Sequence, residues 1–217
     1  MTDGRGWESV HLDELDAIPL PEGLVWRPVR RRLGVLAFGV NAYTSVGPGR
    51  QVVEEHDESG SGAGGHEELY VVVRGHATFT VGGETIDAPA GTIVFIRDPA
   101  LRRVAIAEEE GTFVLAVGGE PGRAYEVSPW EFSFVAQPLL EQGRYAEAIT
   151  LLEGGLADHP GNASLLYDLA CAESRAGRPL EALTNLGEAL RLEPRYVERA
   201  REDPDFDPIR REPGFPA

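Results

Sequence analysis

The sequence contains no lysine, since all 20 of its basic residues are arginine. This excludes reactions that use a lysine Schiff base or a lysine general base. There is one cysteine, Cys171, so a disulfide within the chain and a cysteine-based zinc site are excluded as well. Its apolar neighbours Leu169, Ala170 and Ala172 favour a buried structural thiol over a nucleophile.

Long apolar runs are also missing. No stretch approaches the roughly 20 apolar residues of a membrane span, and the first residues show no basic segment followed by an apolar run. A cytoplasmic protein is therefore expected. The formal net charge is -16, with acidic excess in both halves of the chain, which argues against nucleic acid or an anionic membrane as a partner. No nucleophile elbow, P-loop or H-E-x-x-H motif is present.

The C-terminal half repeats itself at an offset of 34 residues. The matching pairs are Gly143 and Gly177, Ala148 and Ala182, Leu152 and Leu186, Gly155 and Ala189, and Pro160 and Pro194. Each unit shows apolar residues at helical spacing, a glycine, a second helical stripe and a proline. This pattern predicts two helix-turn-helix units stacked on one another.

The period, the central glycine, the alanine and the final proline resemble the tetratricopeptide repeat, over Pro129 to Pro194. A third helix from about Arg195 to Glu202 is expected to cap the stack, followed by an acidic closing segment. Stacked helix pairs need neighbours to bury their faces, so two units are expected to lean on the rest of the chain or on a second copy. The resemblance implies a peptide-binding face; the alternative is an array that only extends the fold or makes a dimer contact.

The N-terminal half changes to short β-rich runs separated by turns. The runs are Leu33–Tyr43, Glu68–Arg74, Ala77–Val81, Thr92–Arg97, Arg103–Ala107 and Thr112–Val117. Gly82 and Gly83 form a two-residue hairpin signal. Many short strands of this kind predict a sandwich or a barrel.

The run from His66 to Gly75 resembles the first motif of the cupin superfamily, since Glu68 and Gly75 have the six intervening residues that the motif requires. The hairpin from Gly83 to Gly91 resembles the segment between the two cupin motifs. The resemblance covers about residues 47–117. It implies a cupin-type β-barrel or jelly roll, so the predicted fold class is this barrel followed by an all-helical domain. The predicted domains are residues 1–128, with a core at about 33–118, and residues 129–217.

In cupins, three histidines and the motif glutamate hold a divalent metal, and this sequence departs from that pattern. The first two histidine positions fall on Gly62 and Gly64, and the final histidine position falls on Arg102. Only Glu68 is retained in this register. An arginine stays protonated and cannot bind a metal cation.

Two orientations of Arg102 remain open. Facing inward, it would pair with Glu68 or hold an anionic ligand; facing outward, it would have no part in the site. Since side chains alternate along a strand, Tyr70 would share the inner face with Glu68. Asn41 and Tyr43 are further candidates to contact a ligand.

A second register treats the glycine-rich loop at residues 59–65 as an insertion. Glu54 and His56 would then share a strand face, as would His66 and Glu68. These four residues form a mixed nitrogen and oxygen set suited to a divalent metal. The alternative is a solvated acidic edge, because residues 54–58 form a run of charge.

The leading hypothesis is a non-catalytic protein that holds a small, anionic ligand in the barrel, with no metal cofactor, while its helices contact a partner protein or a second copy. The rival is a metal-dependent cupin oxygenase or isomerase that uses His56, His66, Glu68 and Glu54. A third hypothesis makes the barrel a platform for a homodimer. Fold analogy alone does not choose among them.

Overall fold

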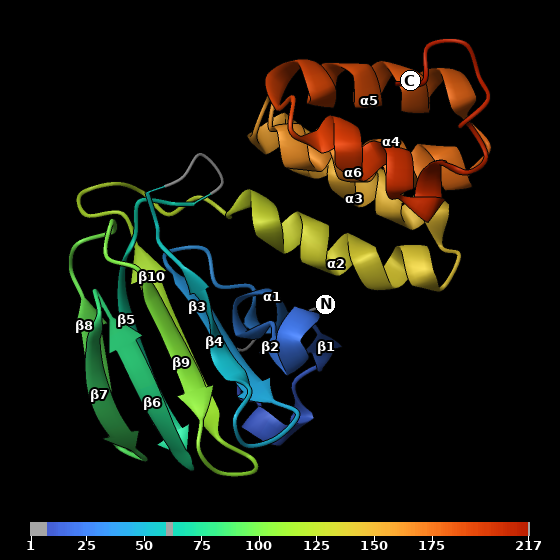
Figure 1. Cartoon of the computed structure of the whole chain (residues 1–217). Coiled ribbons are helices and arrows are strands. Elements are labelled where there is room, and N and C mark those ends of the chain that lie inside the picture. The colour runs from blue at the N-terminus through green and yellow to red at the C-terminus, as the bar shows by residue number, and fades with distance from the viewer. Residues whose placement is uncertain (1–7, 60–62, 217) are drawn as a thin grey trace. The chain divides into compact units, whose positions relative to one another are not determined.

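The computed structural model describes residues 8–59 and 63–216, and the chain divides into two compact units (Figure 1). The units are Met1–Val127, which we call the β unit, and Ser128–Ala217, which we call the helical unit. Within the described residues, no helix combines the length and the apolar character needed to cross a membrane.

The β unit consists of two antiparallel sheets. The six-stranded sheet has the order β1 (Ile18–Pro19), β2 (Leu24–Arg27), β3 (Gly39–Ser45), β10 (Phe113–Gly119), β5 (Glu67–Arg74) and β8 (Ile93–Ile96). The four-stranded sheet has the order β4 (Gln51–His56), β9 (Arg103–Ala107), β6 (His76–Val81) and β7 (Glu84–Pro89). Strands that are neighbours in a sheet are mostly distant in sequence, as in a jelly roll.

The core of the β unit is formed by side chains that alternate along the strands. On β9, Arg103, Ala105 and Ala107 are buried while the residues between them are half-buried. Tyr70 and Val72 are the buried positions of β5. This alternation places one face of each strand in the core, which is the predicted pattern of a two-sheet barrel.

One predicted strand is wrong in its first half. The run Leu33–Tyr43 was expected to be continuous, but Leu33 ends the short helix α1 (Val29–Leu33) and β3 begins only at Gly39. Gly34 ends the helix in the left-handed conformation, with φ of 63°. An apolar run by itself does not distinguish a strand from a short helix followed by a turn.

The helical unit contains two helix pairs and a further helix. They are α2 (Pro129–Glu141), α3 (Tyr145–Asp158), α4 (Ala163–Arg175), α5 (Pro179–Leu192) and α6 (Tyr196–Glu202). Gly143 and Gly177, 34 residues apart, follow α2 and α4 with φ of 72° and 74°. Left-handed glycines of this kind are common just beyond a helix C-terminus. The predicted alternation of helix, glycine turn and helix is therefore present.

Close helix contact explains one of the small residues in the repeat. A Cβ atom at Gly155 would lie 2.8 Å from Cγ of Phe132, which is too short for any side chain at this position. The C-terminal segment then covers the second repeat. Phe206, in the short 3-10 helix η3 (Pro204–Phe206), and Ile209 are 0% and 1% exposed and pack with α4 and α5 residues. The tail thus supplies a neighbour within the helical unit itself.

Candidate functional site

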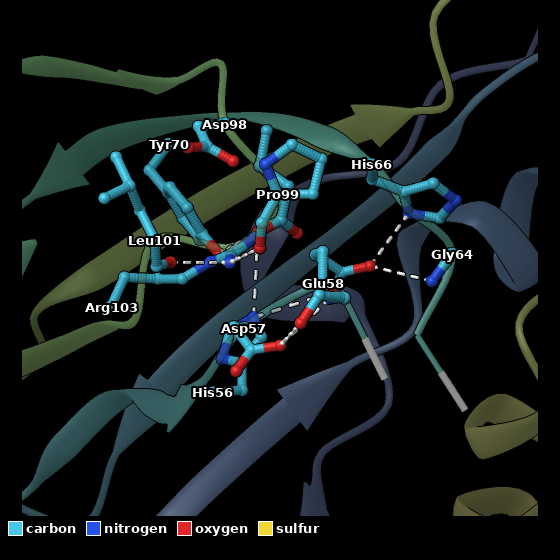
Figure 2. A network of polar contacts seen from close by, with 12 residues as sticks. His56, Asp57, Glu58, Gly64, His66, Tyr70, Asp98, Pro99, Leu101 and Arg103 are labelled. Atoms are coloured by element: carbon cyan, nitrogen blue, oxygen red, sulfur yellow. Dashed lines mark hydrogen bonds and ion pairs between the residues drawn. The ribbon is translucent and has the colours of Figure 1, made fainter. Parts of the chain in front are cut away.

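Six polar side chains meet inside the β unit. Figure 2 shows five of them and the contacts of Glu58 with His66 and Gly64. The six come from the end of β4 and the residues after it, from β5 and the residue before it, and from the start of β9. We call them the polar cluster: His56, Glu58, His66, Glu68, Tyr70 and Arg103.

The centre of the polar cluster is a buried ion pair. Arg103 Nη2 and Nε donate to Oε2 of Glu68 at 2.6 and 3.1 Å. The hydroxyl of Tyr70, two residues along β5, donates to the same oxygen at 2.5 Å. Glu68 Oε2 therefore accepts three hydrogen bonds, two of them from a guanidinium group. Charge-assisted bonds of this type are the strong ones in proteins.

Arg103 is fixed on its other side as well. Its side chain is 0% exposed, and Nη1 donates to the backbone oxygens of Leu101 and Pro99 at 2.9 and 3.2 Å. The guanidinium group is thus held between a carboxylate and two carbonyl groups. A buried charge needs such partners, because leaving it unpaired costs several kcal/mol.

The imidazole of His56 is oriented by the backbone. Its Nδ1 lies 2.8 Å from the carbonyl oxygen of Glu54, so Nδ1 carries the proton in that bond. The other nitrogen, Nε2, lies 3.6 Å from Glu68 Oε2 and 3.8 Å from Glu58 Oε1. Both distances exceed those of ordinary hydrogen bonds, so Nε2 faces two carboxylates without a close bond to either.

Glu58 and His66 form the other side of the cluster. Glu58 Oε2 accepts a hydrogen bond from the backbone of Gly64 at 2.9 Å and lies 3.6 Å from Nδ1 of His66. A Cβ atom at Gly64 would lie 2.0 Å from Nε2 of His66. Only glycine therefore allows the chain to pass so close to this imidazole.

Electrostatics keep Glu68 ionised. Burial raises the pKa of its carboxyl group, but the contacts with His56 and Tyr70 and the charge of Arg103 outweigh burial and bring the pKa to about 2. For His56, burial lowers the pKa, and the contacts with Glu68 and the Glu54 carbonyl give a net raised pKa. Burial and the negative charge of Glu68 raise the pKa of the Tyr70 phenol, so it remains a donor.

The cluster is not sealed from solvent. The side chains of His56, Glu58, His66 and Glu68 remain 25%, 10%, 12% and 13% exposed. Carboxylate and imidazole groups that are largely buried and still reachable can exchange hydrogen bonds with a small molecule.

The structure brings four of the predicted site residues together: His56, His66, Glu68 and Tyr70. Asn41 and Tyr43 lie on β3, two strands away in the same sheet. Asn41 is in register with Ala116 of β10, which is in register with Tyr70. Residues directly opposite one another share a sheet face, so Asn41 lies on the inner face, one row from Glu68.

Glu54 is not part of the cluster. The prediction that Glu54 and His56 share a strand face is wrong. The pairing of β4 with β9 shifts register between Val53 and His56, a β-bulge or a similar irregularity. Val52 and Val53 are both buried, whereas Glu54 is exposed. An irregularity of this kind breaks the alternation on which the prediction depended.

The inward orientation of Arg102 is also wrong. Its side chain is 64% exposed, and its Nε pairs with Oε1 of Glu55 at 3.2 Å. Arg103, the first residue of β9, takes the inward position. A shift of one residue exchanges the two faces of a strand, so two adjacent arginines could not be told apart from the sequence.

Sequence reasoning missed Glu58 and Arg103 as site residues. Glu58 ends the charged run at residues 54–58, which was interpreted as a solvated edge in the alternative to a metal site. The residue is only 8% exposed. The spacing His56-x-Glu58, in a sequence that retains only the cupin motif ligand Glu68, could have indicated that Glu58 belongs to the site. For Arg103, the signal was only its adjacency to Arg102.

The resemblance to cupins implies a divalent metal, and the contacts of the polar cluster indicate whether its residues could hold one. Ligand atoms of His56, Glu58 and Glu68 lie within 4.8 Å of one another. The Glu68 oxygen that faces His56 is Oε2, which already accepts from Tyr70 and twice from Arg103. A cation there would lie beside a fixed guanidinium and compete with it. The contacts of Oε2 therefore disfavour a metal ion bound through this oxygen.

A second group of potential ligand atoms lies in the helical unit, at Cys171, Asp203 and Asp205. Asp203 accepts from the Tyr167 hydroxyl and caps η3 through the backbone of Asp205. Burial raises the pKa of the Cys171 thiol, whereas a metal needs the thiolate. This group holds the tail in place.

The fold thus defines a two-part protein, with an antiparallel β-barrel unit followed by a helical repeat unit. Residues 139–195 match the tetratricopeptide repeat family model. The predicted order, a two-sheet β-barrel followed by an all-helical domain, is confirmed. No curated protein matches the chain.

Three of the solved structures that resemble the chain are named as cupins or as members of the cupin superfamily. A cupin protein from Bacteroides fragilis is 18% identical, over 57% of this chain and 92% of that chain, with a TM-score of 0.37. An RmlC-like cupin from Shewanella frigidimarina is 14% identical, over 52% and 91%, with a TM-score of 0.38. A sugar phosphate isomerase of the cupin superfamily from Silicibacter pomeroyi is 14% identical, over 52% and 75%, with a TM-score of 0.42. At these values we transfer no residue role from them.

Proposed function

We propose that the β unit is a non-catalytic binding domain that takes a small molecule at the polar cluster without a metal ion. One observation supports this most directly. The fully buried guanidinium of Arg103 is bonded to Glu68, the only one of the four cupin metal ligands that the motif register retains. The positive charge that a metal would place beside Glu68 is supplied by the protein itself.

The state of Glu68 also argues against proton transfer at this residue. A general base works best when its pKa lies near the operating pH. With a pKa of about 2, Glu68 stays ionised at neutral pH and is a weak base. Its function is then to position Arg103, Tyr70 and His56, while His56, Glu58 and His66 remain to contact a ligand.

The placement of Arg102 removes the reason for expecting an anionic ligand. Arg102 is exposed and paired with Glu55, and Arg103 is committed to Glu68 and two backbone carbonyls. The carboxylate of Glu58 would repel an anion, and the positive charge that the raised pKa of His56 favours is already faced by Glu58 and Glu68. The proposed ligand is therefore not an anion.

The test is a metal titration of the whole chain, purified without chelator or affinity metal. Native mass spectrometry should show a metal-free protein, and calorimetry with Mn²⁺, Ni²⁺ and Zn²⁺ should show no stoichiometric binding. One metal per chain, lost in Glu58→Gln and kept in the matched control Glu54→Gln, would overturn the proposal in favour of the metal-dependent rival.

We also propose that the helical unit contacts a partner protein or a second copy of the chain. Support comes from its repeat architecture and from Leu180, which is 77% exposed at the start of α5. Light scattering with size exclusion tests the self-contact. A dimer in the parent chain that becomes monomeric in Leu180→Glu supports it, and a monomer at all working concentrations argues against it.

A further inference from the structure

Two glycines lie in register with Glu68 on the inner face of the six-stranded sheet. Gly39 of β3 is in register with Gly118 of β10, which is in register with Glu68 of β5. Side chains at these three positions would share one face. A Cβ atom at Gly118 would lie 3.2 Å from Cγ of Glu68 and 3.5 Å from Cβ of His66. A side chain at Gly118 would crowd Glu68 and His66, so glycine at this position lets both side chains lie close over the strand.

An aromatic ring from outside the strands packs over Gly39. Tyr125 belongs to the segment that follows β10, and a Cβ atom at Gly39 would lie 2.9 Å from Cε2 of Tyr125. The Tyr125 ring also lies beside the imidazole of His66, with ring centroids 5.8 Å apart and planes tilted by 36°. Tyr125 and His66 thus form a continuous aromatic wall at one side of the cluster.

We propose that Tyr125 completes the binding site and that the ligand is an uncharged ring bearing several hydroxyl groups. This rests on the proposed function, because it requires that the polar cluster binds a small molecule. Hydroxyl groups donate to carboxylates and exchange hydrogen bonds with imidazoles, which are the groups that Glu58, His56 and His66 offer. The apolar face of such a ring packs against an aromatic side chain.

Charge selects among ligands of this shape. Arg103 balances Glu68, and a protonated His56, whose pKa is raised, balances Glu58. The cluster then has no positive charge left for a phosphorylated or carboxylated ring, whose charge would be buried without a partner. Hydroxyl groups carry no such penalty.

The five histidines of the chain provide a built-in readout. Imidazole NMR resonances would be recorded while the full-length protein is titrated with D-glucose, D-galactose, myo-inositol and uridine. Charged counterparts are D-glucose 6-phosphate and D-glucosamine. We expect at least one neutral probe to shift His56 and His66 and to leave His11, His76 and His159 unchanged, with weaker or no response to the phosphate.

Variants then test Tyr125 itself. Tyr125→Ala and Tyr125→Leu should weaken the neutral probe about 3- to 10-fold, the range expected for one aromatic contact, while Tyr125→Phe keeps the ring and the affinity. Tyr145→Ala, in the helical unit, is the matched control and should leave the affinity unchanged. The leucine variant preserves the bulk of the side chain if the alanine variant does not fold.

The outcomes separate this inference from the proposed function. Unchanged affinity in both Tyr125→Ala and Tyr125→Leu would overturn the role of Tyr125 and leave the binding site standing. A response to the phosphate alone, or no response of His56 and His66 to any neutral probe, would overturn the ligand class. Stoichiometric uptake of a metal in the titration above would instead overturn the proposed function.

Discussion

Each unit of the protein holds a tyrosine hydroxyl that donates to a carboxylate, but the two contacts have different surroundings. In the β unit, Tyr70 donates to Glu68 at 2.5 Å, and Arg103 and His56 face the same oxygen. In the helical unit, Tyr167 donates to Asp203 at 2.9 Å, and Asp203 also caps the tail helix η3. The first carboxylate belongs to a cluster of charged groups, and the second fastens one segment of chain to another.

The difference shows how to separate a candidate site from a structural contact. Polar groups of the helical unit tie sequence-distant segments together: Ser174 donates to the backbone of Asp205, and Asn185 donates to Glu173. In the β unit, His56 Nε2 faces two carboxylates at distances too long for hydrogen bonds. Polar groups with hydrogen-bonding capacity left over, and with access to solvent, are those that a ligand can use.

The largest expected effect comes from Arg103→Met. It would leave the Glu68 carboxylate buried without its main partner, which costs about 3–5 kcal/mol of unfolding free energy. Urea unfolding followed by hydrogen exchange should place the loss in the β unit and leave the helical unit protected. The double variant with Glu68→Gln should recover part of the loss, and a loss below about 1 kcal/mol in the single variant would contradict the role of the ion pair.

The next largest effect is expected from acid, which should change the stability of the two units in opposite directions. The Glu68 pKa of about 2 lies below its ordinary value of 4.5, so its stabilisation is present above pH 4.5 and is lost as the pH falls from 4.5 towards 2. The loss is about 3 kcal/mol in the β unit. In the helical unit, burial raises the pKa of Asp168 to about 6, so that unit gains stability as the pH falls through 6 towards 4.

Calorimetry between pH 7 and pH 2, with hydrogen exchange to assign each transition, measures both trends. Glu68→Gln should reduce the acid dependence of the β unit, and Asp168→Asn should reduce the gain in the helical unit. A parallel loss of stability in both units between pH 7 and pH 2 would contradict the expected difference in their pH dependence.

Substitution of the two tyrosines should have effects of intermediate size on the free energy of unfolding, and the two variants form a matched pair. Tyr70→Phe should cost about 2 kcal/mol, because a hydrogen bond to a buried charged group is lost. Tyr167→Phe should cost about 1 kcal/mol, because Asp203 is half-buried and water can replace the hydroxyl. Chemical denaturation of both variants measures the difference, and a larger cost for Tyr167→Phe would reverse the comparison.

The smallest effect is expected for Arg102→Met, which removes an exposed ion pair with Glu55. Such pairs contribute little, so the change should stay within about 0.5 kcal/mol. Measured beside Arg103→Met under the same conditions, it tests which of the two adjacent arginines faces inward. Equal losses in both variants would contradict the register of β9.

The fold was largely predictable because its signals are local and repeated. The 34-residue offset marked both helix pairs, and glycine turns marked most strands. The cluster was only half predictable. Glu68 follows from the motif, and His56 and His66 follow from the second register. The irregular pairing of β4 removes Glu54, and the register of β9 replaces Arg102 with Arg103. Neither leaves a mark in the sequence, because pairing partners lie tens of residues away.

The sequence by itself therefore determined the two units, the repeat, and a glutamate flanked by histidines without the usual metal ligands. Only the tertiary structure decided which charge balances that glutamate, which carboxylate joins it, and that Tyr125 packs beside His66 over Gly39. The physical reason is that strand alternation is local, whereas pairing register and the close approach of distant backbones depend on packing between sheets.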